Sequence, residues 1–285
     1  MKNKKILVYG GAGVLGKSII KSLIKNNFLN VYSGDIVECD VKGVKSLKIN
    51  IFNKEEVFSS ILGKDIVINC TGQITKPINN CFEQNTKGIS NIISVLNENR
   101  NVYFIQISSV NVLGTIFTEA NENSIINPET PYSTSKAFAE FLINENLMSN
   151  KSSIIRLSNL YGENLSKGVV SYLINSFNAG NVLSFNNNGD LIRYYLHTDD
   201  AANNIVNFIQ KGQFKGIYHL VGNEKYSIKE LVSICENVSG KNIKVNYDNI
   251  KPWENINFID DSKIKSIINV EYQHNLKRFF QSLLK

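Results

Sequence analysis

The N-terminal half of the chain alternates short apolar runs with segments in which apolar residues recur at helical spacing. Residues 4–9 form the first run, and residues 14–27 carry a stripe that includes Val14, Ile19 and Leu23. Apolar residues three to four positions apart share one face of a helix, whereas a continuous run rich in Val and Ile is typical of a strand buried on both faces. We therefore expect a strand and then a helix at the N-terminus.

The same alternation continues to about residue 157, and it indicates the class of fold. Apolar runs predict strands at residues 31–35, 47–49, 65–70, 102–108 and 152–157, and periodic segments predict helices at 54–62, 82–98 and from 132 onward. Because strands alternate with helices, the pattern predicts an α/β protein with a doubly wound parallel sheet covered on both faces. Residues 118–131, rich in Asn, Glu and Pro, are expected to form a loop.

A glycine-rich turn links the first expected strand to the first helix. Gly10, Gly13 and Gly16 give the spacing G-x-x-G-x-x-G, and Val14 and Leu15 open the helix. Glycines let the backbone turn tightly and approach a pyrophosphate closely, while the N–H groups at the helix N-terminus bind its charge. Since the turn lies between a strand and a helix, it predicts a dinucleotide-binding Rossmann fold rather than a turn without a ligand.

An acidic residue ends the second expected strand. Asp35 follows Gly34 and lies 19 residues after Gly16. A carboxylate there can accept hydrogen bonds from the adenosine ribose, and it repels the 2′-phosphate of NADP. The position therefore favours NAD over NADP; the alternative is a turn aspartate, because turns favour Asp.

The periodicity also suggests how the chain is divided. After residue 160 the elements become shorter and less regular, although a helix is expected at about 200–211. We expect residues 1–160 to form the NAD-binding Rossmann domain, completed by roughly 190–215. The remaining residues are expected to form a smaller, mostly C-terminal substrate-binding lobe, made of 161–189 and 216–285.

Tyr132 and Lys136 form the spacing Y-x-x-x-K at the start of a predicted helix, which Thr130 and Pro131 are suited to open. Residues four apart lie on one face of a helix, so the ammonium group can stabilise a phenolate. Ser109, at the carboxyl end of the fifth expected strand, can hydrogen-bond the same reacting oxygen. Together these residues predict proton exchange with a substrate hydroxyl or carbonyl during hydride transfer; the alternative is a surface pair on an amphipathic helix.

Composition and charge narrow the class of protein. The chain has 285 residues, of which 42% are apolar and 20% charged, as in a folded globular enzyme. No apolar run approaches the roughly 20 residues of a membrane helix, and no secretion signal follows the basic N-terminus. The net charge of +6 comes from scattered lysines, so we expect neither nucleic acid nor membrane as a partner.

The cysteines suggest a reducing location and no metal site. None of them forms a C-x-x-C pair or lies at metal-ligand spacing from a histidine: Cys39, Cys70, Cys81 and Cys235. We therefore expect free thiols, no bound metal and a cytoplasmic protein. His197 is interpreted either as a pocket residue or as a packed one, and His219 as a core residue.

With these motifs in place, the chain resembles the extended short-chain dehydrogenase/reductase family, and within it the NAD-dependent epimerase/dehydratase group. The positions that match the nucleotide motif, its ribose-binding acid and the catalytic triad are Gly10, Gly13, Gly16, Asp35, Ser109, Tyr132 and Lys136. The resemblance implies that NAD is bound by the nucleotide motif and also by Val14, Leu15, Cys70, Thr71, Gly72, Asn85, Tyr132 and Lys136.

The same resemblance implies what the protein acts on and with what it assembles. The substrate would be a sugar nucleotide, contacted by Ser109, Asn159 and Arg193. The assembly would be a homodimer packed through helices near 85–98 and 132–148, as in the family.

Departures from the family pattern limit the reaction. A dehydratase of this family carries an Asp-Glu pair after the strand-five hydroxyl, where this chain has Val110 and Asn111. This favours an epimerase that works through a keto-sugar intermediate. The alternatives are an NAD(P)H-dependent reductase of a nucleotide-linked keto-sugar and, in another class, a non-catalytic dinucleotide-binding sensor. Tyr194 replaces an aspartate of the family pattern, and contact of Lys251 or Trp253 with substrate is left open.

Overall fold

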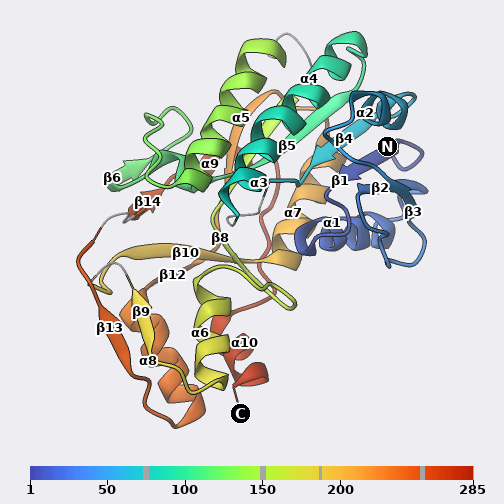
Figure 1. The fold of residues 1–285 in the computed structure, drawn as a ribbon. Coiled ribbons are helices and arrows are strands. Elements are labelled where there is room, and N and C mark those ends of the chain that lie inside the picture. Colours follow the sequence, from blue (N-terminus) through green and yellow to red (C-terminus); the bar gives the residue numbers. More distant parts are fainter. Residues whose placement is uncertain (73–76, 148–151, 186–187, 251–253, 285) are drawn as a thin grey trace.

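The computed structural model describes residues 1–72, 77–147, 152–185, 188–250 and 254–284. In this part of the chain, a seven-stranded parallel sheet has the strand order β11-β7-β5-β4-β1-β2-β3 (Figure 1). Its strands are β1 (Lys5–Tyr9), β2 (Asn30–Asp35), β3 (Lys45–Lys48), β4 (Ile66–Asn69), β5 (Tyr103–Ser109), β7 (Ser152–Leu157) and β11 (Gly216–Leu220). The order reverses between β1 and β4, which confirms the doubly wound sheet expected from the sequence.

Helices cover both faces of this sheet. On one face are α1 (Val14–Lys25) and α7 (Thr198–Lys211); on the other are α2 (Lys54–Ile61), α4 (Ile89–Glu98) and α5 (Pro131–Leu147). Ile6 and Val8 of β1 pack into the first core, and Leu7 and Tyr9 into the second, because successive side chains of a strand point to opposite faces. None of the helices in the described ranges is long and apolar enough to cross a membrane.

The predicted helix over residues 82–98 is divided into three pieces. Helix α3 (Ile78–Glu83) leads into a π-helical turn at Gln84–Gly88, and α4 follows it. A π-helical turn is rare and is often found at functional sites. Here it turns the side chain of Asn85 into the core, against the segment that follows β4 and against α5.

A smaller lobe lies beyond the carboxyl edge of the large sheet (Figure 1). Its elements are β8 (Asn159–Tyr161), α6 (Val169–Asn178), β9 (Leu183–Phe185), β10 (Ile192–His197), β12 (Glu224–Ser227), α8 (Ile228–Ser239), β13 (Val245–Tyr247) and α10 (Leu276–Leu283). They enclose a core of their own, in which Tyr161, Leu173, Leu231 and Phe280 are buried. Strand β10 lies between β8 and β12 in this second sheet. Because β8 begins at Asn159, directly after the end of β7 at Leu157, the chain passes from the large sheet straight into the smaller one.

Two sequence expectations differ from the structure. Residues 116–120 form strand β6 (Ile116–Ala120), which includes the first three residues of the expected loop, because they pair with β14 (Ile256–Ile259) from far along the chain. Residues 216–285 do not lie wholly in the smaller lobe. Strand β11 is the edge strand of the large sheet beside β7, and Ile264 of α9 (Ser262–Lys265) packs in its core. Pairings between distant segments leave no local periodic signal, which explains both differences.

Candidate active site

The glycine turn lies between β1 and α1, at the carboxyl edge of the sheet. Gly10 has φ +71°, where residues with a side chain are rarely found, and a Cβ there would lie 3.1 Å from the backbone carbon of Cys70. Gly13 is the N-cap of α1, and no side chain caps the N–H groups of the first turn, to which Val14 and Leu15 belong. A narrow turn whose only side chain is the methyl group of Ala12, ahead of such a helix N-terminus, fits a dinucleotide pyrophosphate.

Asp35 lies at the carboxyl end of β2, beside this turn. Its Oδ2 accepts a hydrogen bond from the backbone N–H of Ala12 at 3.1 Å, and its Oδ1 accepts one from Val37 at 3.4 Å. The carboxylate therefore braces the glycine turn, a contact that the sequence did not reveal. A carboxylate offers about four acceptor positions, so it can still accept hydrogen bonds from ribose hydroxyls.

Lys136 is fully buried, and its ammonium group lies at the ends of two central strands. Its Nζ donates to the carbonyl of Thr71 at 2.9 Å, just after β4, and to the carbonyl of Ile107 at 3.2 Å, within β5. Burial lowers the pKa of this lysine to about 8, since removal from water disfavours the charged form. The charge is therefore held at a defined point beneath the glycine turn.

The structure brings the other two members of the expected triad to the same corner. Tyr132 lies in the first turn of α5, four residues before Lys136 and half-buried. Ser109 ends β5, two residues after the carbonyl that accepts from Lys136, and its Oγ accepts a hydrogen bond from the N–H of Asn111 at 3.2 Å. The segments that carry Ser109, Tyr132 and Lys136 thus meet near the carboxyl edge of the sheet, where ligands of such sheets bind.

The segment after β4 is fixed by hydrogen bonds from its neighbours. The Nδ2 of Asn85 is within hydrogen-bond distance of Gly72 O (3.1 Å) and Ser135 Oγ (3.1 Å), and a Cβ on Gly72 would overlap Asn85. Cys70 is buried, and burial raises the pKa of its thiol to about 12. Asn85 thus acts as a brace between α5 and the segment after β4, which packs against Gly10.

Two of the expected substrate residues, Asn159 and Arg193, lie in the smaller sheet. Asn159 on β8 and Arg193 on β10 line a small pocket together with Asn111, and the Nδ2 of Asn159 donates to the carbonyl of Tyr194 at 3.3 Å. Glu254, which the sequence did not single out, lines the same pocket. Of the residues left open in the sequence, Lys251 and Trp253 lie outside the described residues.

A buried ion pair behind the triad was also missed. Arg156 on β7 makes two-pronged hydrogen bonds to Glu140 on α5, with Nη2–Oε2 at 2.7 Å and Nε–Oε1 at 3.0 Å, and both side chains are almost inaccessible to solvent. Ser108 donates to the same carboxylate at 2.5 Å. Glu140 lies four residues after Lys136, on the same face of α5, so charges one turn apart tie this helix to β5 and β7. The spacing of Lys136 and Glu140 can be read from the sequence, but the pairing of Glu140 with Arg156 cannot.

His219 extends this buried network. It is fully buried on β11; its Nε2 lies 3.4 Å from Arg156 Nη1 and its Nδ1 lies 3.1 Å from the carbonyl of Asp260. Burial and the neighbouring guanidinium lower its pKa to about 4. Its placement agrees with the expected core role.

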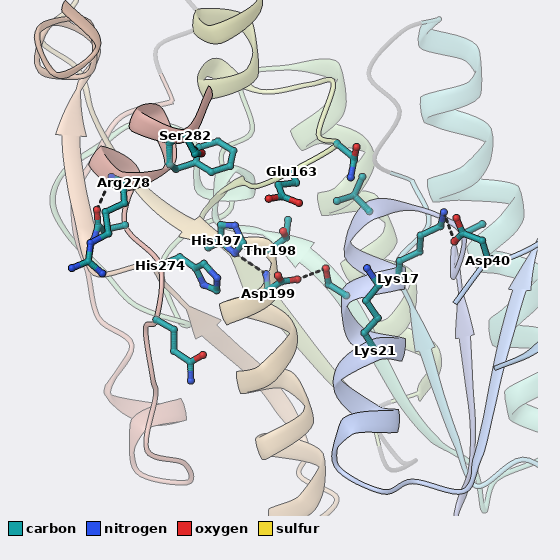
Figure 2. Close-up of a pocket in the computed structure, with 17 residues that line it drawn as sticks. Lys17, Lys21, Asp40, Glu163, His197, Thr198, Asp199, His274, Arg278 and Ser282 are labelled. Carbon is teal, nitrogen blue, oxygen red and sulfur yellow. Dashed lines mark hydrogen bonds and ion pairs between the residues drawn. The ribbon is translucent and has the colours of Figure 1, made fainter. Parts of the chain in front are cut away.

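A second cavity, of about 660 Å³, lies beside the glycine turn between α1 and the C-terminal segment (Figure 2). Lys17 and Lys21 project from α1 on one side, and Arg278 lies on the other. Its lining also carries acids, of which Asp40 pairs with Lys17 at 2.6 Å. Because cations and acids line it together, its charge alone favours no class of ligand.

His197 lines this cavity, and its side chain packs against that of His274. Its ring stacks on that of His274, with centroids 3.8 Å apart and planes 15° apart, and its Nδ1 accepts the N–H of Asp199 at the start of α7. Ligand atoms of these residues lie within 4.8 Å of one another. A metal ion lies near the plane of each imidazole that binds it, and stacked rings do not share such a position. We interpret the group as a packing contact that holds the C-terminal segment against α7.

The buried ion pair generates a stability prediction. Glu140→Gln is expected to lower the free energy of unfolding by about 3–5 kcal/mol, because Arg156 remains charged, buried and without a charged partner. Urea unfolding measures this loss. The double variant Glu140→Gln/Arg156→Met removes both charges and should recover much of it. Asp190→Asn breaks an exposed pair with Lys229 and should cost less than about 1 kcal/mol; a similarly small loss for Glu140→Gln would contradict the role given to the buried pair.

The lowered pKa of Lys136 predicts how stability depends on pH. Between the folded-state pKa of about 8 and the ordinary value of 10.5, the unfolded chain binds more protons than the folded chain. The cost of burying the charge is therefore full below about pH 8 and is relieved as the pH rises. Relative to Lys136→Met, the wild-type protein should gain roughly 2–3 kcal/mol between about pH 7 and pH 10, measured by urea unfolding. A difference that does not change with pH would contradict this account of the lysine.

Known proteins are similar to this chain over most of its length. A putative UDP-glucose 4-epimerase of Methanocaldococcus jannaschii is 28% identical over 276 residues, which cover 87% of this chain and 86% of that protein. A dTDP-D-glucose 4,6-dehydratase of Dictyostelium discoideum is 26% identical over 266 residues; the match covers 76% of this chain but only 58% of the length of that relative.

Solved structures share the fold at low identity. UDP-glucuronic acid 4-epimerase from Bacillus cereus, in complex with UDP-glucuronic acid and NAD, superposes with a TM-score of 0.87 at 20% identity, over 98% of each chain. A dTDP-glucose 4,6-dehydratase from Streptomyces venezuelae, with NAD bound, gives 0.87 at 18% identity, over 98% of this chain and 95% of that one.

The family profile described as the NAD dependent epimerase/dehydratase family matches residues 6–221. This range contains the glycine turn, Asp35 and all three members of the expected triad, and it confirms both the resemblance and the expectation of NAD as the cofactor. The chain belongs to the NAD-dependent epimerase/dehydratase family of enzymes.

Proposed function

We propose that this protein is an NAD-dependent sugar-nucleotide epimerase that acts by hydride transfer through a keto-sugar. The observation that carries the proposal is the convergence of the Ser109, Tyr132 and Lys136 segments at the carboxyl edge of the sheet, beside a turn that fits a pyrophosphate. The family relationship and the sugar-nucleotide enzymes among the similar proteins support it.

The residues of the chain would divide the work as follows. NAD⁺, when bound, would supply hydride transfer: a carbinol carbon of the sugar would lose a hydride to it, and the resulting carbonyl carbon would regain the hydride on its opposite face. Tyr132 would take the hydroxyl proton as the hydride leaves and give it back to the carbonyl oxygen afterwards. Lys136 would stabilise the phenolate through its charge, and the hydroxyl of Ser109 would hold the reacting oxygen by a hydrogen bond.

Epimerase activity is favoured over dehydration by the residues that follow Ser109. Val110 carries no titratable group, and the side chain of Asn111 is a neutral amide that donates to Glu254 at 3.1 Å. Elimination of water from a keto-sugar needs an acid and a base near the leaving hydroxyl. Neither residue can supply one. Asp35 supports NAD over NADP, which also favours redox-neutral chemistry over an NADPH-dependent reductase.

The substrate grip is proposed for residues of the smaller lobe. Asn159 and Arg193 lie next to the segment that follows Ser109, and a guanidinium group is suited to bind a diphosphate through paired hydrogen bonds. We propose that these two residues contact the nucleotide diphosphate while the sugar lies toward Ser109 and Tyr132.

A homodimer is proposed from the apolar surface of α5. Phe138 and Phe141 lie one turn apart on this helix and are 44% and 56% exposed, and they stack on each other with ring centroids 6.3 Å apart. Exposed aromatic pairs on a helix are typical of interfaces. Sedimentation equilibrium is expected to give twice the mass of the chain, and Phe138→Ser/Phe141→Ser to give the monomer mass; a wild-type monomer would contradict the proposal.

The function is tested on the purified protein. Denaturation should release NAD, and a panel of UDP-, GDP-, dTDP- and CDP-sugars should yield an epimer of at least one of them without added cofactor. Tyr132→Phe should lower kcat by roughly 10²–10⁴-fold and leave the NAD content unchanged, because only proton transfer is lost. Tyr172→Phe, at a tyrosine that is 40% exposed on α6, is the matched control.

The other outcomes identify the alternatives. Turnover that requires added NADH or NADPH would make the protein a reductase. Absence of turnover, together with unchanged biological activity of Tyr132→Phe, would make it a dinucleotide-binding sensor.

A further inference from the structure

Glu254 connects the two segments that carry the catalytic hydroxyl groups. Its Oε2 accepts a hydrogen bond from the Nδ2 of Asn111 at 3.1 Å, and its Oε1 accepts one from the Oγ1 of Thr130 at 2.8 Å. Asn111 follows Ser109 by two residues, and Thr130 precedes Tyr132 by two. A single carboxylate, from a segment more than a hundred residues further along the chain, therefore spans the end of β5 and the start of α5.

The carboxyl group of Glu254 is buried among donors that come from both segments. Burial and the negative charge of Glu129 raise its pKa, whereas hydrogen bonds from Thr130 and Ser133 lower it. The positive charge of Arg193, which lines the same pocket, also lowers it. Because the carboxyl oxygens accept hydrogen bonds from Asn111 and Thr130, one carboxyl group holds both segments.

The backbone at Glu254 is held in an unusual conformation. Its φ is +48°, in the left-handed region that residues with a side chain seldom adopt, and its N–H donates to Oε2 of Glu129 at 3.1 Å. Such a conformation persists only where the surrounding structure maintains it, and it is often found beside functional sites. Glu129 precedes Thr130, so the backbone and the side chain of Glu254 are both attached to the entrance of α5.

We infer that Glu254 is a positioning residue that sets the separation of Ser109 and Tyr132. The inference rests on the proposed function, because it assigns these two hydroxyl groups to one reacting oxygen. Glu254 acts through Asn111 and Thr130 and does not itself transfer the proton. Its loss would leave the glycine turn and Lys136 in place but let the two segments move independently.

This role separates the effects on catalysis and on binding. Misplacement of a catalytic group by about 1 Å can cost roughly 100-fold in rate. Glu254→Ala is therefore expected to lower kcat by roughly 10–100-fold, with the NAD content changed less than about threefold. Glu254→Gln keeps an acceptor oxygen of the same reach and should recover a large part of the lost kcat. Glu119→Ala, at an exposed glutamate on β6, is the control for loss of a carboxylate and should match the wild type.

Hydrogen exchange tests the connection without any need for turnover. In Glu254→Ala, peptides that cover residues 109–113 and residues 130–136 should both exchange faster, while peptides of β1 and α1 stay protected as in the wild type. Glu119→Ala should change neither peptide. Unchanged exchange of the two segments in Glu254→Ala would overturn the inference, whatever its activity.

The two measurements together distinguish this inference from the proposed function. Faster exchange of both segments with an unchanged kcat would show that Glu254 joins them without positioning the reaction, and would overturn its role. If the wild type converts no sugar nucleotide, the proposed function fails while the exchange result still decides whether Glu254 joins the segments. A loss of kcat in Glu254→Gln as large as in Glu254→Ala, with slow exchange kept, would assign Glu254 to proton transfer and would also overturn positioning.

Discussion

A buried ammonium group sets the main constraint on this molecule. Lys136 must leave water, and the carbonyls of Thr71 and Ile107 compensate only part of the cost. Those carbonyls belong to the neighbouring β4 and β5 segments, so the lysine can be accommodated only if the first turns of α5 lie against both of them. The buried charge therefore fixes the position of the helix that carries Tyr132 and Lys136.

The rest of the site keeps α5 in that position from several sides. Glu140, one turn further along the helix, is tied to β7 by Arg156 and to β5 by Ser108. Asn85 braces the helix from the π-helical turn, at Ser135. These contacts come from elements on different sides of the helix. The first half of α5, which carries Lys136, is thus held by buried contacts with several elements. The smaller lobe adds the proposed substrate contacts.

Local patterns in the sequence were sufficient to predict the strands of the large sheet other than β11 and to propose the triad. The glycine turn, the strand that ends at Asp35 and the Tyr132–Lys136 spacing are each encoded within a few residues, so one chain is enough to find them. The contacts that hold the site join different elements of the structure. Arg156 on β7 pairs with Glu140 on α5, and β6 pairs with β14 more than a hundred residues further along the chain. Glu254, also more than a hundred residues further along, binds Thr130 at the start of α5. Such contacts depend on tertiary structure and leave no periodic signal.

The most direct test of the account concerns the path of hydrogen at the carbon that changes configuration. The wild-type enzyme should be incubated with its sugar nucleotide in D₂O, and the carbon-bound deuterium of the epimer measured by mass spectrometry and NMR. Hydride transfer to NAD⁺ and back returns the original hydrogen, so the account predicts an epimer without solvent deuterium at that carbon. Incorporation of one deuterium per turnover at the inverted carbon would show that the carbon loses a proton instead, and would contradict the hydride mechanism assigned to Ser109, Tyr132 and Lys136.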